Sequence, residues 1–325
     1  MATFSEQKTG FPLSEVLGKG AFLVKNPFKN NKHKADKELR ATLIEGLELL
    51  RDERGVFTAA LSDDYNACWM RDQLYANLCY YYLGDKKKFR EGLRIVFEMC
   101  YQSKDKIDST VAYKPSHTHD FVHAKFCAQT LKEITNDWGH HQIDAIGLFL
   151  YMIGFAHERN IPVIESEKER EMVQLLVQYL TAVRYWEEPD NGMWEEWTEP
   201  HASSIGAAVA GLQKVKEQKL AVVADSLIAH GLASLHALLP KETPVRDQDL
   251  AQLSLIWPYR VVATGGRDRP DHRRSDRGQR NSAKLSFAAS CDQGRDRSGP
   301  RRTQEGRDRA LPQVPDGQRR TPERR

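Results

Sequence analysis

Residues 190–206 read Asp-Asn-Gly-Met-Trp-Glu-Glu-Trp-Thr-Glu-Pro-His-Ala-Ser-Ser-Ile-Gly. The stretch joins a turn with polar and aromatic side chains to the start of a helix that is rich in small residues. Small side chains allow the axis of a second helix to come close. The same order, a polar-aromatic cluster followed directly by a helix, recurs along the chain and predicts how the helices are arranged.

Clusters of this kind precede alternate helices. They are Trp69-Met70-Arg71-Asp72, Asp137-Trp138-Gly139-His140, the stretch from Asp190 to Trp197, and Trp257-Pro258-Tyr259. The intervals between their tryptophans match the length of one helical hairpin, which indicates a weak internal repeat. If the hairpins form a ring, alternate helices form its inner wall and their leading ends open at one mouth. Unpaired N–H groups at these helix ends can donate hydrogen bonds to the hydroxyl groups of a ligand, and the helix dipoles stabilise developing negative charge.

Apolar residues recur at helical spacing through most of the chain. The periodicity predicts helices near residues 36–53, 69–83, 86–102, 140–157, 172–183, 201–214, 220–235 and 247–257. The segment 140–157 is apolar almost all round, which predicts that it is fully buried. Only residues 121–130 show an alternation typical of a strand. The predicted fold class is therefore all-α.

Charge and composition change near residue 260. Residues 1–260 carry 31 basic and 36 acidic residues, whereas residues 261–325 carry 16 Arg, one Lys and nine acidic residues. The first part therefore offers no broad basic face for nucleic acid. The second part has no apolar period and a single aromatic residue, Phe287. It cannot bury enough surface to offset its chain entropy, so we expect a disordered C-terminal tail.

Two interpretations of the tail are open. An Arg-rich segment that binds nucleic acid is disfavoured, because Arg alternates with Asp and aromatic residues for base stacking are nearly absent. We favour a slip of the coding frame near Val262, which predicts that another reading frame of the gene continues the helical pattern. The predicted organisation is an N-terminal segment over 1–35, a helical domain over 36–260 and the tail over 261–325.

The sequence shows no signal for export or for a membrane. The N-terminus lacks an apolar segment of signal-peptide length, and no run reaches the roughly 18 apolar residues of a membrane span. The five cysteines form no CxxC pair, and their odd number fits reduced thiols. We therefore expect a cytoplasmic protein with no membrane partner.

Two adjacent carboxyl groups, Glu195 and Glu196, lie between the indoles of Trp194 and Trp197. An apolar wall beside a carboxyl group disfavours the ionised form and raises the pKa, as a general acid near neutral pH requires. Flat indole faces also suit the apolar face of a sugar ring. From these residues alone, a half-buried helix edge with two solvated carboxylates is an equal alternative.

The histidines predict no metal site. His119 and His123 have the spacing of a helical zinc pair, but no HExxH motif surrounds them, and together with His117 they are interpreted as a polar rim loop. The pair His140-His141 is interpreted as a helix start near sugar. We therefore expect neither a metal ion nor an organic cofactor.

Six pieces of sequence occur in an order that is specific to a known family. They are Cys-Trp-Met-Arg-Asp (68–72), Phe-Val-His-Ala-Lys-Phe (121–126), Trp-Gly-His-His-Gln-Ile-Asp-Ala (138–145), Asp-Asn-Gly-Met-Trp-Glu (190–195), His-Ala-Ser-Ser-Ile-Gly (201–206) and Leu-Ser-Leu-Ile-Trp-Pro-Tyr (253–259). Together they resemble glycoside hydrolase family 15, the glucoamylase family. They are most similar to its branch that includes the α and β regulatory subunits of phosphorylase kinase. The resemblance covers roughly residues 36–260.

The resemblance implies an (α/α)6 toroid of the six-hairpin glycosidase type. It implies inverting hydrolysis that releases glucose from the non-reducing ends of α-1,4-glucans, so the implied partner is an α-glucan or maltooligosaccharide. Glu195 matches the general acid of the family. Glu196 matches a neighbouring carboxylate that helps to hold sugar.

The other matched residues surround the sugar. Arg71 and Asp72 match residues that hydrogen-bond the hydroxyl groups of the terminal glucose, and Asp190 matches an acid that tunes the site. Three indoles match walls of the sugar subsites: Trp69, Trp138 and Trp194.

Inversion also needs a second carboxylate on the opposite face of the sugar, roughly 6.5–9.5 Å from the first, to activate water. In the family this base comes from a late hairpin, and the sequence after residue 260 has no counterpart. The resemblance therefore implies an incomplete toroid with impaired hydrolysis and with self-association through exposed apolar flanks. The alternative is a non-catalytic glucan-binding or regulatory protein like the phosphorylase kinase subunits.

Overall fold

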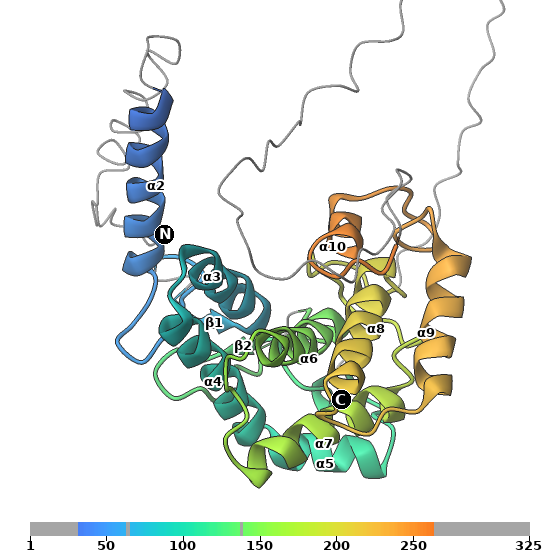
Figure 1. Cartoon of the computed structure of the whole chain (residues 1–325). Coiled ribbons are helices and arrows are strands. Elements are labelled where there is room, and N and C mark those ends of the chain that lie inside the picture. Colours follow the sequence, from blue (N-terminus) through green and yellow to red (C-terminus); the bar gives the residue numbers. More distant parts are fainter. Residues whose placement is uncertain (1–31, 63–65, 137–138, 263–325) are drawn as a thin grey trace, which may run out of the picture. The chain divides into compact units, whose positions relative to one another are not determined.

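The computed structural model describes residues 32–262, apart from 63–65 and 137–138, with side chains from residue 37 onward (Figure 1). All of these residues belong to one compact unit, which is almost entirely helical. The predicted all-α class is confirmed. Trp138 and nearly all of the predicted tail lie outside the described residues.

The elements follow the predicted order closely. They are α2 (Lys32–Leu49), β1 (Cys68–Trp69), α3 (Met70–Leu83), α4 (Lys86–Gln102), α5 (Lys104–Ala112), η2 (Thr118–Asp120), β2 (Lys125–Phe126), α6 (Ile143–Glu158), α7 (Glu167–Val183), α8 (Ala202–Glu217), α9 (Asp225–Leu238), η3 (Leu250–Gln252) and α10 (Leu253–Ile256). The 3-10 turns are η2 and η3.

Three elements differ from the sequence prediction. Helix α5 was not predicted, because only Ile107 and Thr110 are buried among its nine residues and no apolar period results. The helix expected near 247–257 is reduced to η3 and the four residues of α10. The alternation at 121–130 produces only the short strand β2, which pairs antiparallel with β1.

Local signals explain several helix ends. Ser166 and Glu169 form a capping box at the start of α7. Asp85 caps α4 because its side chain accepts a hydrogen bond from the Lys88 N–H group. Gly84 ends α3 with a φ of 85°, a left-handed conformation that glycine adopts without steric cost.

The core is organised around the contact between α6 and α8, and α8 lies between α6 and α9 (Figure 1). Residues 143–156 of α6 are all buried, as predicted. Small residues bring the two backbones together. A Cβ atom on Gly147 would lie 2.5 Å from backbone atoms of Ala207 and Ala208, and one on Gly211 would overlap the carbonyl oxygen of Gly147.

Backbone hydrogen bonds connect the leading ends of α3 and α6 with the loop before α8. The Met70 N–H donates to the Ala124 carbonyl (2.8 Å), and the Ala124 N–H donates to the His140 carbonyl (3.1 Å). The Asn191 N–H donates to the His141 carbonyl (2.8 Å). The prediction that alternate helices begin at one shared region is therefore confirmed for α3, α6 and α8.

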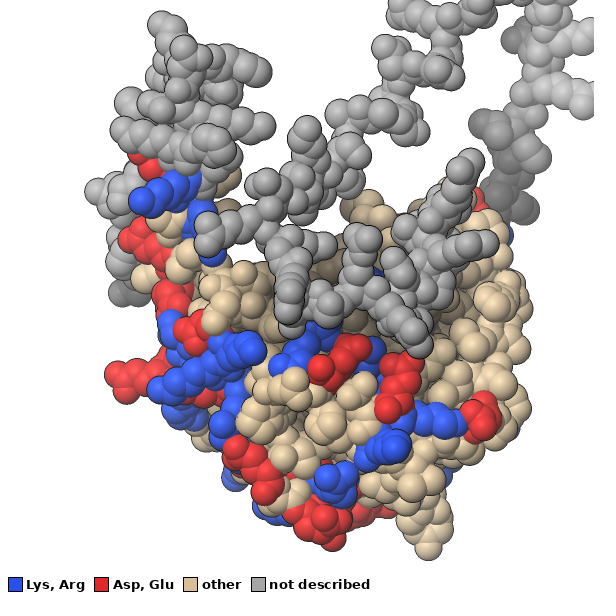
Figure 2. All heavy atoms as spheres, viewed as in Figure 1, with Lys and Arg blue, Asp and Glu red and all other residues tan. Residues whose placement is uncertain are grey.

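The surface of the described residues is mixed in charge. On the face shown in Figure 2, Lys and Arg side chains are interspersed with Asp and Glu. Some of these residues connect helices, such as Arg94 of α4 and Glu169 of α7, whose Nη1 and Oε1 atoms are 2.8 Å apart. Within the described segments, no helix combines the length and the apolar character needed to cross a bilayer.

The substitution Gly147→Ala is expected to lower the free energy of unfolding by about 1–3 kcal/mol, because the added methyl group must displace the backbone of α8. Gly46→Ala on α2, where a Cβ atom meets open space, is the control and should gain up to about 1 kcal/mol from higher helix propensity. Urea unfolding followed by circular dichroism measures both variants. A Gly147→Ala protein as stable as the wild type would refute the close backbone contact.

Candidate active site

A buried guanidinium group, that of Arg71, connects three segments of the site. Its Nη1 atom donates to Gln142 Oε1 (2.8 Å) and to the Asp144 carboxylate (3.0 Å and 3.2 Å), both at the start of α6. Its Nη2 atom donates to the Met193 carbonyl (2.7 Å) and to Glu195 Oε1 (3.0 Å), in the loop before α8. Hydrogen bonds between charged groups are the strongest of their kind. Arg71 therefore fixes the position of the loop relative to α3 and α6.

Glu195 lies in a turn that directs its carboxyl group at Arg71. Its φ of 60° is left-handed, which is uncommon for a residue other than glycine and typical of constrained functional sites. Three residues earlier, Gly192 has a φ of 62°, and a Cβ atom there would lie 2.7 Å from the ring of His201. Glycine is therefore the residue that lets this turn pack against His201.

Burial raises the pKa of Glu195 to about 7, although the guanidinium of Arg71 acts in the opposite direction. The nearby carboxyl groups of Asp72 and Asp144 add to the increase. A carboxyl group with this pKa is partly protonated near neutral pH, as a proton donor requires. The predicted increase is present, but Trp197 is 76 % exposed and contributes little of the burial.

Asp190 and His201 form a buried pair beneath the same loop. Asp190 Oδ1 lies 2.9 Å from His201 Nδ1, and Asp190 Oδ2 accepts a hydrogen bond from the Ile143 N–H group (2.9 Å). Asp190 therefore caps α6 from the loop that precedes α8. Burial raises the pKa of Asp190. Burial works against the charged form of His201, but the Asp190 carboxylate raises the pKa of this imidazole above its usual value.

A second loop holds the residues on either side of Glu195. The Trp194 Nε1 atom donates to Asp249 Oδ1 (2.6 Å), and Glu196 forms an ion pair with Arg246. Arg246 and Asp249 are themselves paired (3.1 Å). The indole of Trp194 is 48 % exposed, so part of it is available to a ligand. Sequence reasoning missed Arg246 and Asp249 because they belong to none of the polar-aromatic clusters.

The other residues matched to sugar binding have different surroundings. Trp69 directly precedes α3 and is buried, with Lys125 Nζ 4.7 Å from the centre of its ring system. Asp72 is exposed in the first turn of α3. The structure therefore brings Arg71, Asp190, Trp194, Glu195 and Glu196 into one connected group, while Trp138 lies outside the described residues.

Buried polar residues that sequence reasoning did not single out complete the site. Gln142 and Asp144 belong to the sequence motif at residues 138–145, but only the tertiary contacts reveal that they hold Arg71. Glu242 is fully buried and accepts a hydrogen bond from the Ser203 hydroxyl at the start of α8 (2.5 Å). Burial raises the pKa of Glu242 to about 7. No local pattern marks Glu242, because it lies in a loop without helical periodicity.

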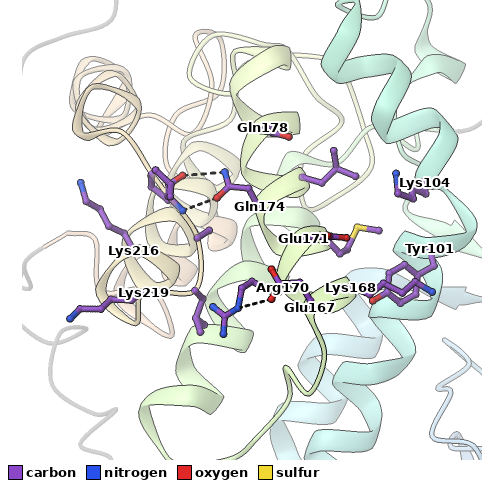
Figure 3. A pocket seen from close by; sticks show the side chains of 16 residues that line it. Tyr101, Lys104, Glu167, Lys168, Arg170, Glu171, Gln174, Gln178, Lys216 and Lys219 are labelled. Carbon is purple, nitrogen blue, oxygen red and sulfur yellow. Dashed lines mark hydrogen bonds and ion pairs between the residues drawn. The ribbon is translucent and has the colours of Figure 1, made fainter.

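A cavity of about 780 Å³ lies elsewhere in the molecule, lined by α7, the end of α4 and the loop after α8 (Figure 3). The Gln174 side chain bonds both backbone polar groups of Val222 across one side of it. On the other side, Lys168 Nζ lies 3.9 Å from the ring centre of Tyr101. None of the residues grouped around Arg71 lines this cavity, so it is separate from the candidate active site.

A family model described as "Glycosyl hydrolases family 15" matches residues 37–233. The phosphorylase b kinase regulatory subunit alpha, skeletal muscle isoform, of Oryctolagus cuniculus is 28% identical over 231 residues, which are 60% of this chain and 18% of the relative. The probable alpha subunit of Drosophila melanogaster is 26% identical over 240 residues, 62% and 19% of the two chains. The chain thus spans less than a fifth of the length of these relatives.

Solved glycosidases share the fold. A wild-type glycosidase has a TM-score of 0.57 and 20% identity, over 68% of this chain and 64% of that chain. A glycosidase variant solved in complex with glucose has a TM-score of 0.58 and 19% identity over the same shares. The likeness shows the fold, and the described helices form part of a glucoamylase-like α/α toroid. The fold class predicted from sequence is confirmed to this extent.

The substitution Arg71→Met is expected to lower the free energy of unfolding by about 3–5 kcal/mol, because it leaves the Asp144 carboxylate buried without its opposite charge. Arg71→Met combined with Asp144→Leu removes both charges and should recover much of this loss. Chemical denaturation of the single and double variants measures the difference. Equal losses in the two proteins would show that the ion pair is not the cause.

The raised pKa of Glu195 predicts a pH-dependent stability. The pKa of Glu195 is 4.5 in the unfolded chain and about 7 in the folded protein, so between these two pH values the folded protein binds a proton that the unfolded chain releases. The resulting stabilisation is complete below the lower value and is lost as the pH rises through the upper one. Glu195→Gln stays neutral, so it should exceed the wild type by about 1–3 kcal/mol near pH 8 and lose this advantage near pH 4.5. Urea unfolding at both pH values tests this, and an unchanged difference would contradict it.

Proposed function

The chain belongs to glycosyl hydrolases family 15, and from this membership we propose that it binds the non-reducing end of an α-1,4-glucan, with Glu195 as proton donor to the glycosidic oxygen. One observation carries the proposal. Glu195 combines a pKa of about 7 with a fixed position beside Arg71, where α3, α6 and the loop before α8 meet. A general acid needs both a suitable pKa and a fixed position.

The chemistry around Glu195 supports sugar recognition. Asp144 holds the Nη1 end of Arg71, and the Nη2 end of Arg71 holds Glu195, so the Glu195 carboxyl group is kept in a fixed position. Glu196 is anchored by Arg246 but keeps 47 % of its side-chain surface exposed, so its carboxylate can accept a sugar hydroxyl. The exposed part of Trp194 offers a flat apolar face to the ring. Fixed polar groups beside an aromatic face are typical of a small-molecule site.

Hydrolysis with inversion needs a second group besides the proton donor. A carboxylate on the opposite face of the sugar, roughly 6.5–9.5 Å from the acid, has to activate a water molecule. We assign none of the described residues to that role. The proposal is therefore a glucoamylase-like site that binds glucan firmly and hydrolyses it slowly, with glucose as the product.

A second candidate function is glucan binding without hydrolysis, in a regulatory protein. The relatives that favour it are regulatory subunits of phosphorylase b kinase. The ion pair between Glu195 and Arg71 also favours it, because a paired carboxylate donates a proton less readily. The two functions share the same binding residues and differ only in whether the glycosidic bond is broken.

Binding and turnover measured on one preparation separate these functions. Binding of an acarbose-type inhibitor is followed by calorimetry, and glucose release from maltooligosaccharides by a coupled assay. For a hydrolase, Glu195→Gln should reduce glucose release by at least about 100-fold with a smaller change in inhibitor affinity, because the variant cannot donate a proton. Glu217→Gln, at the exposed end of α8, is the matched control and should behave as the wild type.

Inhibitor binding without any glucose release would favour the regulatory function. The absence of both binding and release in a folded wild-type protein would reject the proposed site itself.

A further inference from the structure

Three imidazole rings gather beside the start of α6, outside the Arg71 group. His119 comes from η2, His123 from the segment before β2, and His140 from the residues before α6. One ring nitrogen from each lies within 4.8 Å of the others. The ring centres of His123 and His140 are 3.7 Å apart, and those of His119 and His140 are 5.0 Å apart. These three residues form the His cluster.

His123 has surroundings that point to a ligand. Its side chain is buried, with 1 % of the residue exposed, and neither Nδ1 nor Nε2 has a hydrogen-bond partner among the described residues. Buried polar atoms without a partner are rare, because each loses its contact with water and gains nothing in return. Both nitrogens of one buried ring are affected here. An ion coordinated by His123 would remove this deficit for one of them.

His140 is oriented in the way typical of a metal-binding histidine. Its Nε2 atom lies 2.7 Å from the carbonyl oxygen of Thr118. A carbonyl oxygen can only accept, so Nε2 carries the proton and the lone pair of the neutral ring is on Nδ1. In known sites, a backbone carbonyl that accepts the second ring N–H sets the tautomer and the ring orientation.

We propose that the His cluster binds a divalent transition metal ion, of which Zn²⁺ is the best fit, through one ring nitrogen from each residue. Imidazole ligands suit Zn²⁺, Cu²⁺ and Ni²⁺ and not Mg²⁺ or Ca²⁺. Three histidines leave a fourth tetrahedral position for water. The rings of His123 and His140 are nearly parallel, at 2°, so coordination requires rotation about side-chain torsions. Among the described residues, no hydrogen bond holds the ring of His123, so His123 is the ring that can turn.

The position of the His cluster indicates a structural role. The Ala124 N–H bonds the carbonyl of His140, and the Ala124 carbonyl accepts from Met70, the neighbour of Arg71. An ion held by the His cluster would therefore connect η2 and β2 to the start of α6 and stiffen the wall next to Arg71. This role does not depend on the proposed glucan function.

Zinc titration of the full chain, after removal of metal with a chelator, tests the proposal. One Zn²⁺ per chain is expected, with a rise in the unfolding temperature on loading. His119→Gln and His123→Gln should each reduce the Zn²⁺ affinity at least tenfold. His236→Gln, at an exposed position of α9, is the matched control and should bind as the wild type does.

X-ray absorption at the zinc edge of the loaded wild-type protein gives a readout that does not depend on the variants. Two or three imidazole ligands support the proposal, even where His123→Gln fails to fold. Sulfur-dominated coordination would overturn it. So would equal Zn²⁺ affinity in His119→Gln and His236→Gln, or no binding tighter than that of the unfolded chain.

Discussion

The close contact between the backbones of α6 and α8 is the constraint on which the rest of this structure depends. Gly147 and Gly211 allow the two helices to touch without intervening side chains. Because the helices are in contact along their length, the segments that precede them also lie side by side. Asp144 lies in the first turn of α6 and Glu195 in the loop before α8, and a single side chain from α3, that of Arg71, reaches both. Packing in the core therefore creates the geometry of the site.

The electrostatics of the site follow from this geometry. A buried ion pair is weak evidence for stability, because the cost of removing both charges from water offsets much of their attraction. What Arg71 and Asp144 contribute is a fixed charge in a fixed place. Glu195, less deeply buried, has its pKa shifted toward neutrality by its surroundings.

Polar contacts, one buried and the others exposed, also position the turn at Glu195. Asp190 and His201 hold the loop from below, and Arg246 with Asp249 holds it from the side. These contacts explain how a glutamate is kept in a left-handed conformation that an isolated chain rarely adopts. The His cluster includes His140, which precedes α6 directly, so this helix end gathers polar groups from distant parts of the chain.

The sequence by itself determined most of the helices, and it predicts Glu195 as the proton donor. The apolar period predicted α4 at its observed bounds, and the small residues near 201–214 predicted the close helix contact, because both are local patterns. Only the tertiary structure decided which side chains contact one another in the candidate site. Arg71 is separated from Asp144 by 73 residues and from Glu195 by 124, and no pattern of neighbouring residues encodes contacts across such distances. Such pairs, like the stacked histidines, exist because helix packing brings their segments together.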